Sequence, residues 1–319
     1  MRLIAIVLAL TLALPAAANP DRWRVAWPNT DFTRTSVDFS EILSGGPPRD
    51  GIPALSDPGF IAADTETRLD PSEPVITVEL AGAAPRAYPL RYLTWHEIVN
   101  DEVAGVPIAV TFCPLCNSAI TFDRRVAGET LSFGVSGMLR NSDMVMYDRE
   151  TESWWQQAIG RGIVGQHMDT DLVTLPTWME SWQEFRSRNP QGLVMDEPDW
   201  RRPYGTNPYV GYDSSPRPFL YNGEMPPHDI PPLVRVVRVG DRAWPLTRLA
   251  AEGQIVEAGA TLTWTAGQAS ALDANRIGEG RDVGNIRVRD GQGADLPHDV
   301  MFAFAFHAFW PDGEWMLGQ

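Results

Sequence analysis

Two distant stretches of this chain carry the same order of patterns, and this repetition constrains the fold more than any other feature of the sequence. A β-branched run at 75–80 is followed by the motif AYPL at 87–90, and a similar run at 234–239 is followed by AWPL at 243–246. Each motif leads into a short helical pattern and a further strand. The spacing to the next Ile-Val pair differs by one residue, which indicates a divergent duplication. The repetition predicts a strand-rich α+β fold with two divergent, similarly built halves.

Changes in composition divide the chain into five segments. They are a signal peptide at 1–18, an irregular N-terminal arm at 19–72, a first β-rich half at 73–197, a long irregular crossing at 198–232 and a second β-rich half at 233–319. The crossing is assigned because it holds many prolines and aromatic residues. Within the first half, 177–187 (TWMESWQEFRS) predicts a helix that ends at Asn189-Pro190.

The N-terminus has the pattern of a cleavable secretory signal. Arg2 supplies a positive charge, residues 3–14 form an apolar run too short to span a bilayer, and 16–18 are alanines suited to cleavage after Ala18. We therefore expect a secreted protein, periplasmic or extracellular. No later stretch is apolar enough to predict a membrane span after cleavage.

The charge balance narrows the classes of ligand. The chain has 26 Lys+Arg against 41 Asp+Glu, a formal net charge of −15, which argues against nucleic acids because they reward basic surfaces. Neutral, cationic or metallic partners are favoured. All the basic side chains other than histidine are arginines, so a PLP Schiff base and a phosphate-binding lysine are excluded. No GxGxxG or Walker-type motif indicates a nucleotide site.

The two cysteines form a Cys113-Pro-Leu-Cys116 turn between predicted strands. Two thiols three positions apart can ligate a metal, cycle as a redox disulfide or form a static disulfide, and the sequence leaves all three open. A turn between strands favours a metal knuckle over a thioredoxin-type pair, which lies at a helix N-terminus. The second repeat has TAGQ at 265–268 in the corresponding place, so the repeated pattern itself does not require the cysteines.

One such turn supplies only two ligands, so a metal needs further donors. His96 is the best candidate because it precedes the cysteine strand, and a thiolate and imidazole set suits zinc or copper. Attached haem is not expected, because Asn117 rather than histidine follows Cys116.

Polar residues nearby are candidates for a catalytic role beside the thiols. Arg140 and Asp143 belong to a dense polar block that closes a turn or lines a site. A guanidinium at Arg140 could orient an acidic or carbonyl group beside a thiolate. Glu97 is a candidate proton carrier, with a solvent-exposed helix charge as the alternative.

Several long motifs resemble a known bacterial family. They are TFCPLCNSAITFDRR at 111–125, FGVSGMLRNSDMVMYDRETESWWQQ at 133–157, WHEIVND at 95–101 and YGTNPYVGYD at 204–213. Together they are similar to the exported family catalogued as domain of unknown function 3179, and the resemblance covers nearly all of the chain after the signal. It implies no reaction. Members commonly have glycine after the second cysteine, where this chain has Asn117, the next best residue for a left-handed turn.

Two hypotheses of function follow from the sequence. The first is an exported protein with a metal-binding or thiol-redox site at Cys113 and Cys116, with His96, Glu97, Arg140 and Asp143 nearby. The second is a non-catalytic binding or structural protein whose cysteines form a static disulfide. Whether the chain is an enzyme, and on what substrate, is left open at this point.

Overall fold

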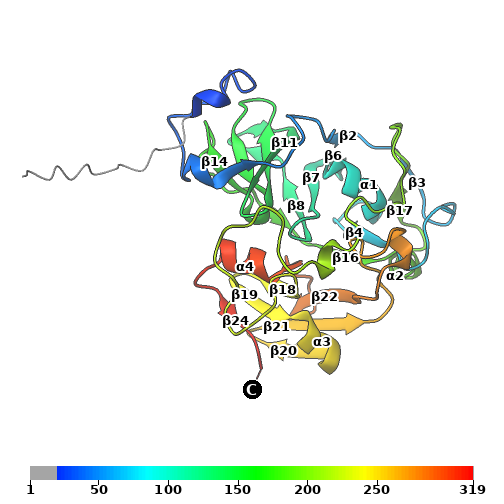
Figure 1. Ribbon diagram of the computed structural model, residues 1–319. Helices are drawn as coiled ribbons and strands as arrows, with labels where there is room; N and C mark the ends of the chain where they lie inside the picture. The colour runs from blue at the N-terminus through cyan, green and yellow to red at the C-terminus, as the bar shows by residue number, and fades with distance from the viewer. Residues whose placement is uncertain (1–19, 319) are drawn as a thin grey trace, which may run out of the picture.

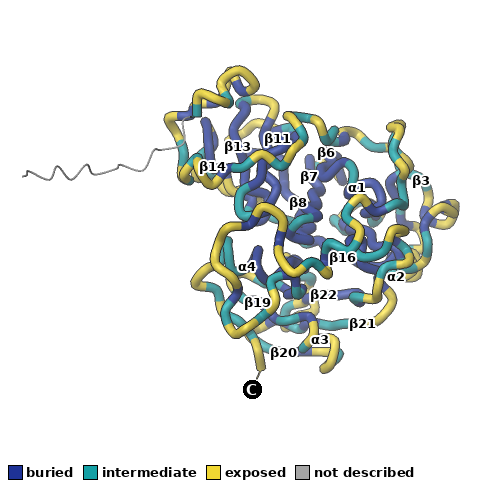
Figure 2. The backbone as a smooth tube through the Cα atoms, viewed as in Figure 1, coloured by how far each residue is buried: buried dark blue, intermediate teal, exposed yellow. Residues whose placement is uncertain are grey.

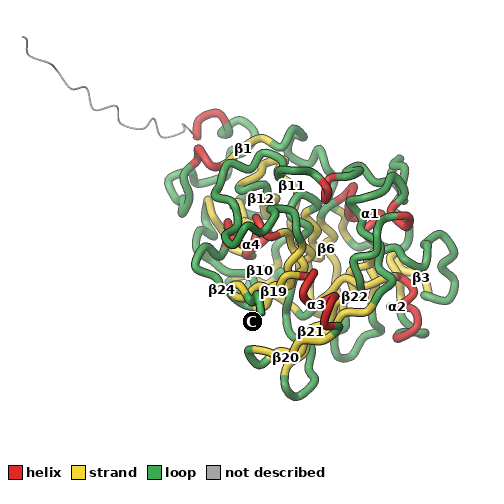
Figure 3. The backbone as a smooth tube through the Cα atoms, turned by 60° about the horizontal axis from the view of Figure 1, so that its bottom comes forward, coloured by secondary structure: helices red, strands yellow, loops and turns green. Residues whose placement is uncertain are grey.

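Five β-sheets in a propeller-like arrangement make up most of the molecule. The computed structural model describes residues 20–318 (Figure 1). Strands account for 37% of the chain and helices for 14%. The strands lie at the centre and long loops surround them (Figure 3).

Two of the sheets matter most for the candidate site. The cysteine sheet has the strand order β15 (Thr174–Leu175), β8 (Ser118–Asp123), β7 (Val106–Cys113), β6 (Ile98–Val103) and β2 (Leu55–Ser56). The carboxylate sheet has the order β1 (Ile42–Ser44), β11 (Phe133–Arg140), β12 (Asp143–Asp148), β13 (Trp154–Gln156) and β14 (Arg161–Val164). Strands β6, β7 and β8 are buried almost throughout (Figure 2), and polar residues among them, such as Asn100 and Thr111, form hydrogen bonds inside the core.

The remaining strands form three further sheets and one short ribbon. The third sheet has the order β16 (Thr177–Ser181), β4 (Pro74–Val78), β5 (Arg86–Pro89), β17 (Leu193–Met195) and β3 (Phe60–Ala62). The fourth has β23 (Asp299–Phe302), β18 (Arg235–Val239), β19 (Arg242–Pro245) and β24 (Glu314–Trp315), and the fifth has β20 (Gln254–Glu257), β21 (Ala260–Thr265) and β22 (Asn285–Asp290). The ribbon pairs β9 (Arg125–Val126) with β10 (Glu129–Thr130).

The helices are short and connect strands. The α-helices are α1 (Leu90–His96), α2 (Trp182–Arg188), α3 (Leu246–Glu252) and α4 (Ala303–Phe309). The 3₁₀ turns are η1 (Pro20–Arg22), η2 (Phe39–Glu41), η3 (Gln157–Ile159), η4 (Tyr212–Ser214) and η5 (Ile277–Glu279). Over residues 20–318, no helix combines the length and the apolar character that crossing a membrane requires.

The repeated motifs correspond to one shared local unit. In each, an antiparallel strand pair leads through proline, Pro89 or Pro245, into a seven-residue helix. Both helices end at a residue with positive φ whose N–H donates to the helix, Glu97 after α1 (φ 58°) and Gly253 after α3 (φ 73°). A positive φ is strained for residues with a Cβ, so glycine is the residue most often found in this position. Glu97 therefore stands where the backbone geometry favours a glycine.

The prediction of an α+β fold with two similar halves joined by a long crossing is wrong. One continuous apolar core runs from Leu55 to Phe306, so the chain is not divided into two bodies. The N-terminal segment supplies β1, β2 and β3 to three different sheets. A local repeat identifies strands that pair with near neighbours, but it gives no information about strands added from elsewhere in the chain. Residues 1–18, the predicted signal, lie outside the described residues.

The predicted helix at 177–187 is wrong in its first half. Residues 177–181 form β16, which pairs antiparallel with β4, and helix α2 begins only at Trp182. All five residues of β16 are buried. The Ser181 hydroxyl accepts a hydrogen bond from the Glu184 N–H and so caps α2. Burial at the sheet edge outweighs the weak helical periodicity of this stretch.

The packing of the N-terminal segment on β11 predicts that one substitution in this strand strongly destabilises the folded protein. Gly137 lies in a bulge of β11 with φ 76°, and a Cβ there would lie 2.0 Å from the Pro47 carbonyl oxygen. Gly137→Ala should lower the free energy of unfolding by about 3 kcal/mol or more. Gly128→Ala is the control, because Gly128 has φ 89° but open space around it, and should cost about 1 kcal/mol. Urea unfolding measures both, and equal losses would contradict the packing described.

Candidate functional site

The two cysteines lie at the turn that joins β7 to β8. Cys113 ends β7 and pairs with Ser118 at the start of β8, and residues 114–117 form the turn between them. Asn117 has φ 54°, the left-handed conformation that its place after Cys116 predicts. Both cysteines are free and buried, and they lie 3.1 Å apart. The structure therefore contains two close thiols and no disulfide between them.

Asp143 reaches the thiols from the neighbouring carboxylate sheet. It follows a two-residue hairpin turn in which Asn141 (φ 51°) and Ser142 (φ 60°) are both left-handed, as a type I′ turn requires. The Cys116 thiol donates a hydrogen bond of 2.9 Å to Asp143 Oδ1. One ligand atom from each of Cys113, Cys116 and Asp143 lies within 4.8 Å of the others. The dense polar block thus both closes a turn and contributes to the cluster.

Two further groups hold the Asp143 carboxylate in place. The Gln156 side-chain amide donates to Oδ2 at 2.6 Å, and the Ala158 N–H donates to the same oxygen at 2.9 Å. Burial raises the pKa of Asp143 above its ordinary value, while these hydrogen bonds oppose the shift. The carboxylate is therefore oriented toward the thiols before any ligand arrives.

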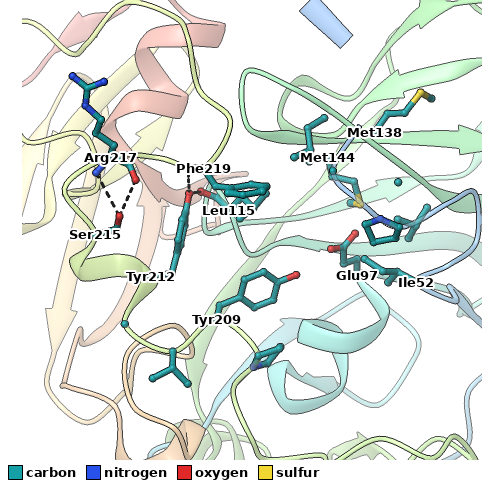
Figure 4. Close-up of a pocket in the computed structure, with 18 residues that line it drawn as sticks. Ile52, Glu97, Leu115, Met138, Met144, Tyr209, Tyr212, Ser215, Arg217 and Phe219 are labelled. Atoms are coloured by element: carbon teal, nitrogen blue, oxygen red, sulfur yellow. Dashed lines mark hydrogen bonds between the residues drawn. The ribbon is translucent and has the colours of Figure 1, made fainter. Parts of the chain in front are cut away.

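Glu97 adds a second buried carboxyl to this region. Burial raises its pKa to about 8, the negative charge of Asp143 adds to the shift, and a hydrogen bond with Tyr209 opposes it. Figure 4 shows the carboxyl group and the Tyr209 hydroxyl pointing toward one another across an opening. Glu97 keeps its side chain at a backbone position where the corresponding helix has Gly253. Strain of this kind, retained beside a cluster of ionisable groups, is typical of functional positions.

The thiols share the electrostatic environment of the two carboxyls. Burial raises the pKa of Cys113 and of Cys116, and the nearby charge of Asp143 raises both further. In the part of the chain that the structure describes, no arginine forms an ion pair or hydrogen bond with Glu97 or Asp143. Four acidic groups are thus buried together without a basic partner. Such a cluster is neutral while protonated and gains most from a bound cation.

Two residues that the sequence predicts for the site lie elsewhere or act indirectly. Both ring nitrogens of His96 are engaged, Nδ1 with the Pro53 carbonyl oxygen at 2.7 Å and Nε2 with the Tyr204 hydroxyl at 2.6 Å. His96 is not part of the group formed by the cysteines and Asp143. Arg140 pairs with Glu41 at 2.7 Å and donates to Gln156 at 3.4 Å, so it reaches Asp143 only through Gln156.

Other residues brace the cysteine turn from outside. Asp299 on β23 accepts hydrogen bonds from the Ser118 hydroxyl and the Ala119 N–H. The Phe302 N–H donates to the Cys116 carbonyl oxygen at 2.9 Å, and the Tyr212 hydroxyl donates to that of Leu115 at 2.9 Å. Burial raises the pKa of Asp299 to about 6. Tyr212 lies in the recognisable block at 204–213, but nothing in the sequence around Asp299 indicates its role.

A cavity of about 660 Å³ adjoins the cluster (Figure 4). Glu97 lines it directly. Leu115, between the two cysteines, and Met144, next to Asp143, also line it. The cavity wall therefore includes direct sequence neighbours of the cluster residues. Its volume is that of a small-molecule site. The segment at 198–232 supplies another wall, including Tyr209 and Tyr212, so this segment is part of the candidate site.

Fold and site together define a β-rich protein with a buried thiol and carboxylate cluster beside a small-molecule cavity. The chain belongs to the family described as "Protein of unknown function (DUF3179)", which it matches over residues 49–313. The family assignment made from the motifs is therefore confirmed. Comparisons with curated proteins and with solved structures give no match.

The raised pKa of Glu97 predicts a pH-dependent stability in metal-free protein. The folded state keeps this proton up to about pH 8, whereas the unfolded chain releases it near 4.5. The folded state therefore binds more protons between these values, and its stability falls as the pH rises through that window, by at most about 1.4 kcal/mol per pH unit. Glu97→Gln removes the titration. We compare the free energy of unfolding of the variant with that of the wild type, measured by urea unfolding with a chelator present. This difference should increase in favour of the variant by about 2 to 4 kcal/mol from pH 5 to pH 8.5.

Glu97→Gly separates this electrostatic effect from backbone strain. It places at the end of α1 the residue type that ends α3, Gly253, and so relieves the backbone strain. It should therefore raise the free energy of unfolding by about 1 kcal/mol at every pH, in addition to the pH-dependent gain. A difference between Glu97→Gln and wild type that stays constant with pH would contradict the buried, protonated state of Glu97.

Proposed function

We propose that the protein is a metal-binding protein in which Cys113, Cys116 and Asp143 hold one divalent cation beside the cavity. The observation that carries the proposal is the burial of two thiols and two carboxyls together without a basic partner. A cation replaces the protons on such ligands and compensates the charge that burial otherwise disfavours.

Zinc is the ion that this donor set fits best. Zinc accepts thiolate sulfur and carboxylate oxygen together, whereas copper in its reduced state prefers sulfur donors alone. Three protein ligands are typical of zinc sites that bind water or substrate in the fourth position. Glu97 lies at the cavity with its proton retained to about pH 8, which suits a proton carrier near such a position.

The redox interpretation fits the thiols less well. A thiol that attacks disulfides needs a lowered pKa, usually from a helix N-terminus or a basic neighbour. Here burial and the charge of Asp143 raise the pKa of both cysteines. The static disulfide remains the alternative function class, because two thiols at 3.1 Å can pair in an oxidising compartment.

Export is part of the proposal and concerns the compartment. The pattern of Arg2, the apolar run at 3–14 and the alanines at 16–18 supports a secreted protein, periplasmic or extracellular. In that setting metal binding and disulfide formation compete for the same two sulfurs. A bound metal would protect the thiols from oxidation.

Elemental analysis of purified full-length protein tests the metal centre. The wild type should carry about one zinc per chain, and Cys113→Ser, Cys116→Ser and Asp143→Asn should each lose most of it because each removes one of three ligands. Glu97→Gln is the matched control, because it removes the other buried carboxyl of the same region without touching a ligand. It should keep its zinc.

Three results would overturn the proposal. They are a fully oxidised, metal-free cysteine pair that resists treatment with reductant and takes up no added zinc, equal zinc loss in Glu97→Gln and Asp143→Asn, and zinc that is retained in the cysteine variants. The first of these would establish the static disulfide. Thiol titration in parallel with the metal assay separates it from simple metal loss during purification.

A further inference from the structure

Three aromatic residues of the segment 198–232 line the cavity beside the cluster. They are Tyr209, Tyr212 and Phe219. Figure 4 shows their rings on different sides of one opening, with the Glu97 carboxyl on the remaining side. Within residues 20–318, none of these three rings packs against another of the three. Tyr209 and Tyr212 also pack against the apolar core, and Tyr212 contacts the Phe302 ring, so the parts of the three rings that line the cavity are the ones a ligand can reach.

One acidic and one basic side chain line this opening. Glu97 is the acidic residue among those that line the cavity, and Arg217 is the basic one. In Figure 4 the Arg217 guanidinium lies on the far side of Tyr212 from Glu97, directed away from the rings. The whole chain carries a formal net charge of −15. The negative ring faces therefore attract a cation whether or not Glu97 is ionised, and a cation bound beside Glu97 favours the ionised carboxylate.

We propose that this cavity binds an organic cation with a methylated ammonium head and an apolar tail. Aromatic rings around an opening bind methylated ammonium groups, because the ring quadrupole attracts a cation that is only weakly hydrated. A primary ammonium or a metal ion would lose more hydration energy on entering such a site. The head lies among Tyr209, Tyr212 and Phe219, next to Glu97.

The rest of the cavity defines the tail. Beyond the rings its walls include Ile52, Val135, Met138 and Leu139, all apolar. A volume of about 660 Å³ exceeds the space that a trimethylammonium group fills, so an apolar substituent fits behind the head. This binding does not depend on the proposed metal. A zinc ion held by two thiolates and a carboxylate would leave one net negative charge nearby and would strengthen it.

Titration calorimetry with small probes tests the proposal on the full chain. Choline and 3,3-dimethylbutan-1-ol have nearly the same shape, but only choline carries a charge. Choline should bind about tenfold more tightly, since a cation–π contribution of 1 to 2 kcal/mol corresponds to roughly that factor. Butyltrimethylammonium should bind more tightly than choline because its tail is apolar.

Phe219 offers a variant that leaves the fold intact, because its side chain is about half exposed (47%). Phe219→Leu should weaken choline binding about fivefold and leave the neutral alcohol unchanged, and Phe219→Tyr should keep wild-type affinity. Equal binding of choline and the alcohol, tighter binding of butanoate than of choline, or no binding of either ammonium probe at millimolar concentration would each overturn the proposal. The same titrations after chelation of metal separate this result from the fate of the metal centre.

Discussion

The burial of four acidic side chains without a basic partner is the constraint on which this structure depends. Cys113, Cys116, Asp143 and Glu97 all have a raised pKa, and burial is the largest cause for each. An arrangement of this kind costs stability when the groups ionise, and a folded protein keeps such a cost where it serves a function. A bound cation is the simplest means of removing it. Both proposals, the metal and the organic cation, follow from this electrostatic imbalance.

Several sheets cooperate to hold the cluster in place. The cysteine sheet provides the thiols and the carboxylate sheet provides Asp143, while β23 of the fourth sheet braces the turn through Asp299. Glu97 comes from the end of α1 and faces the cavity whose other wall is the segment 198–232. Because these parts pack around one apolar core, the positions of Cys113, Cys116 and Asp143 relative to one another depend on all of them.

The sequence predicts the local turns of this region better than the overall architecture. The turn at Cys113 to Cys116, the left-handed Asn117 and the hairpin before Asp143 follow from local rules on turns, and the structure contains them. The ligand role expected for His96 rests on proximity in sequence, and the structure gives both of its nitrogens other partners. The five-sheet arrangement and the brace at Asp299 depend on contacts between distant segments, which local periodicity does not encode. The unusual backbone conformation of Glu97 becomes apparent only in the structure, where the end of α1 corresponds to the end of α3 and Glu97 to Gly253.

X-ray absorption at the zinc edge of the reduced, zinc-loaded protein tests the central claim most directly, because it reports the donor atoms themselves. The account predicts two sulfur donors at about 2.3 Å and oxygen donors at about 2.0 to 2.2 Å, with the sulfur signal lost in Cys113→Ser, Cys116→Ser protein. A first shell with nitrogen and oxygen donors alone, or reduced protein that takes up no zinc, would contradict it.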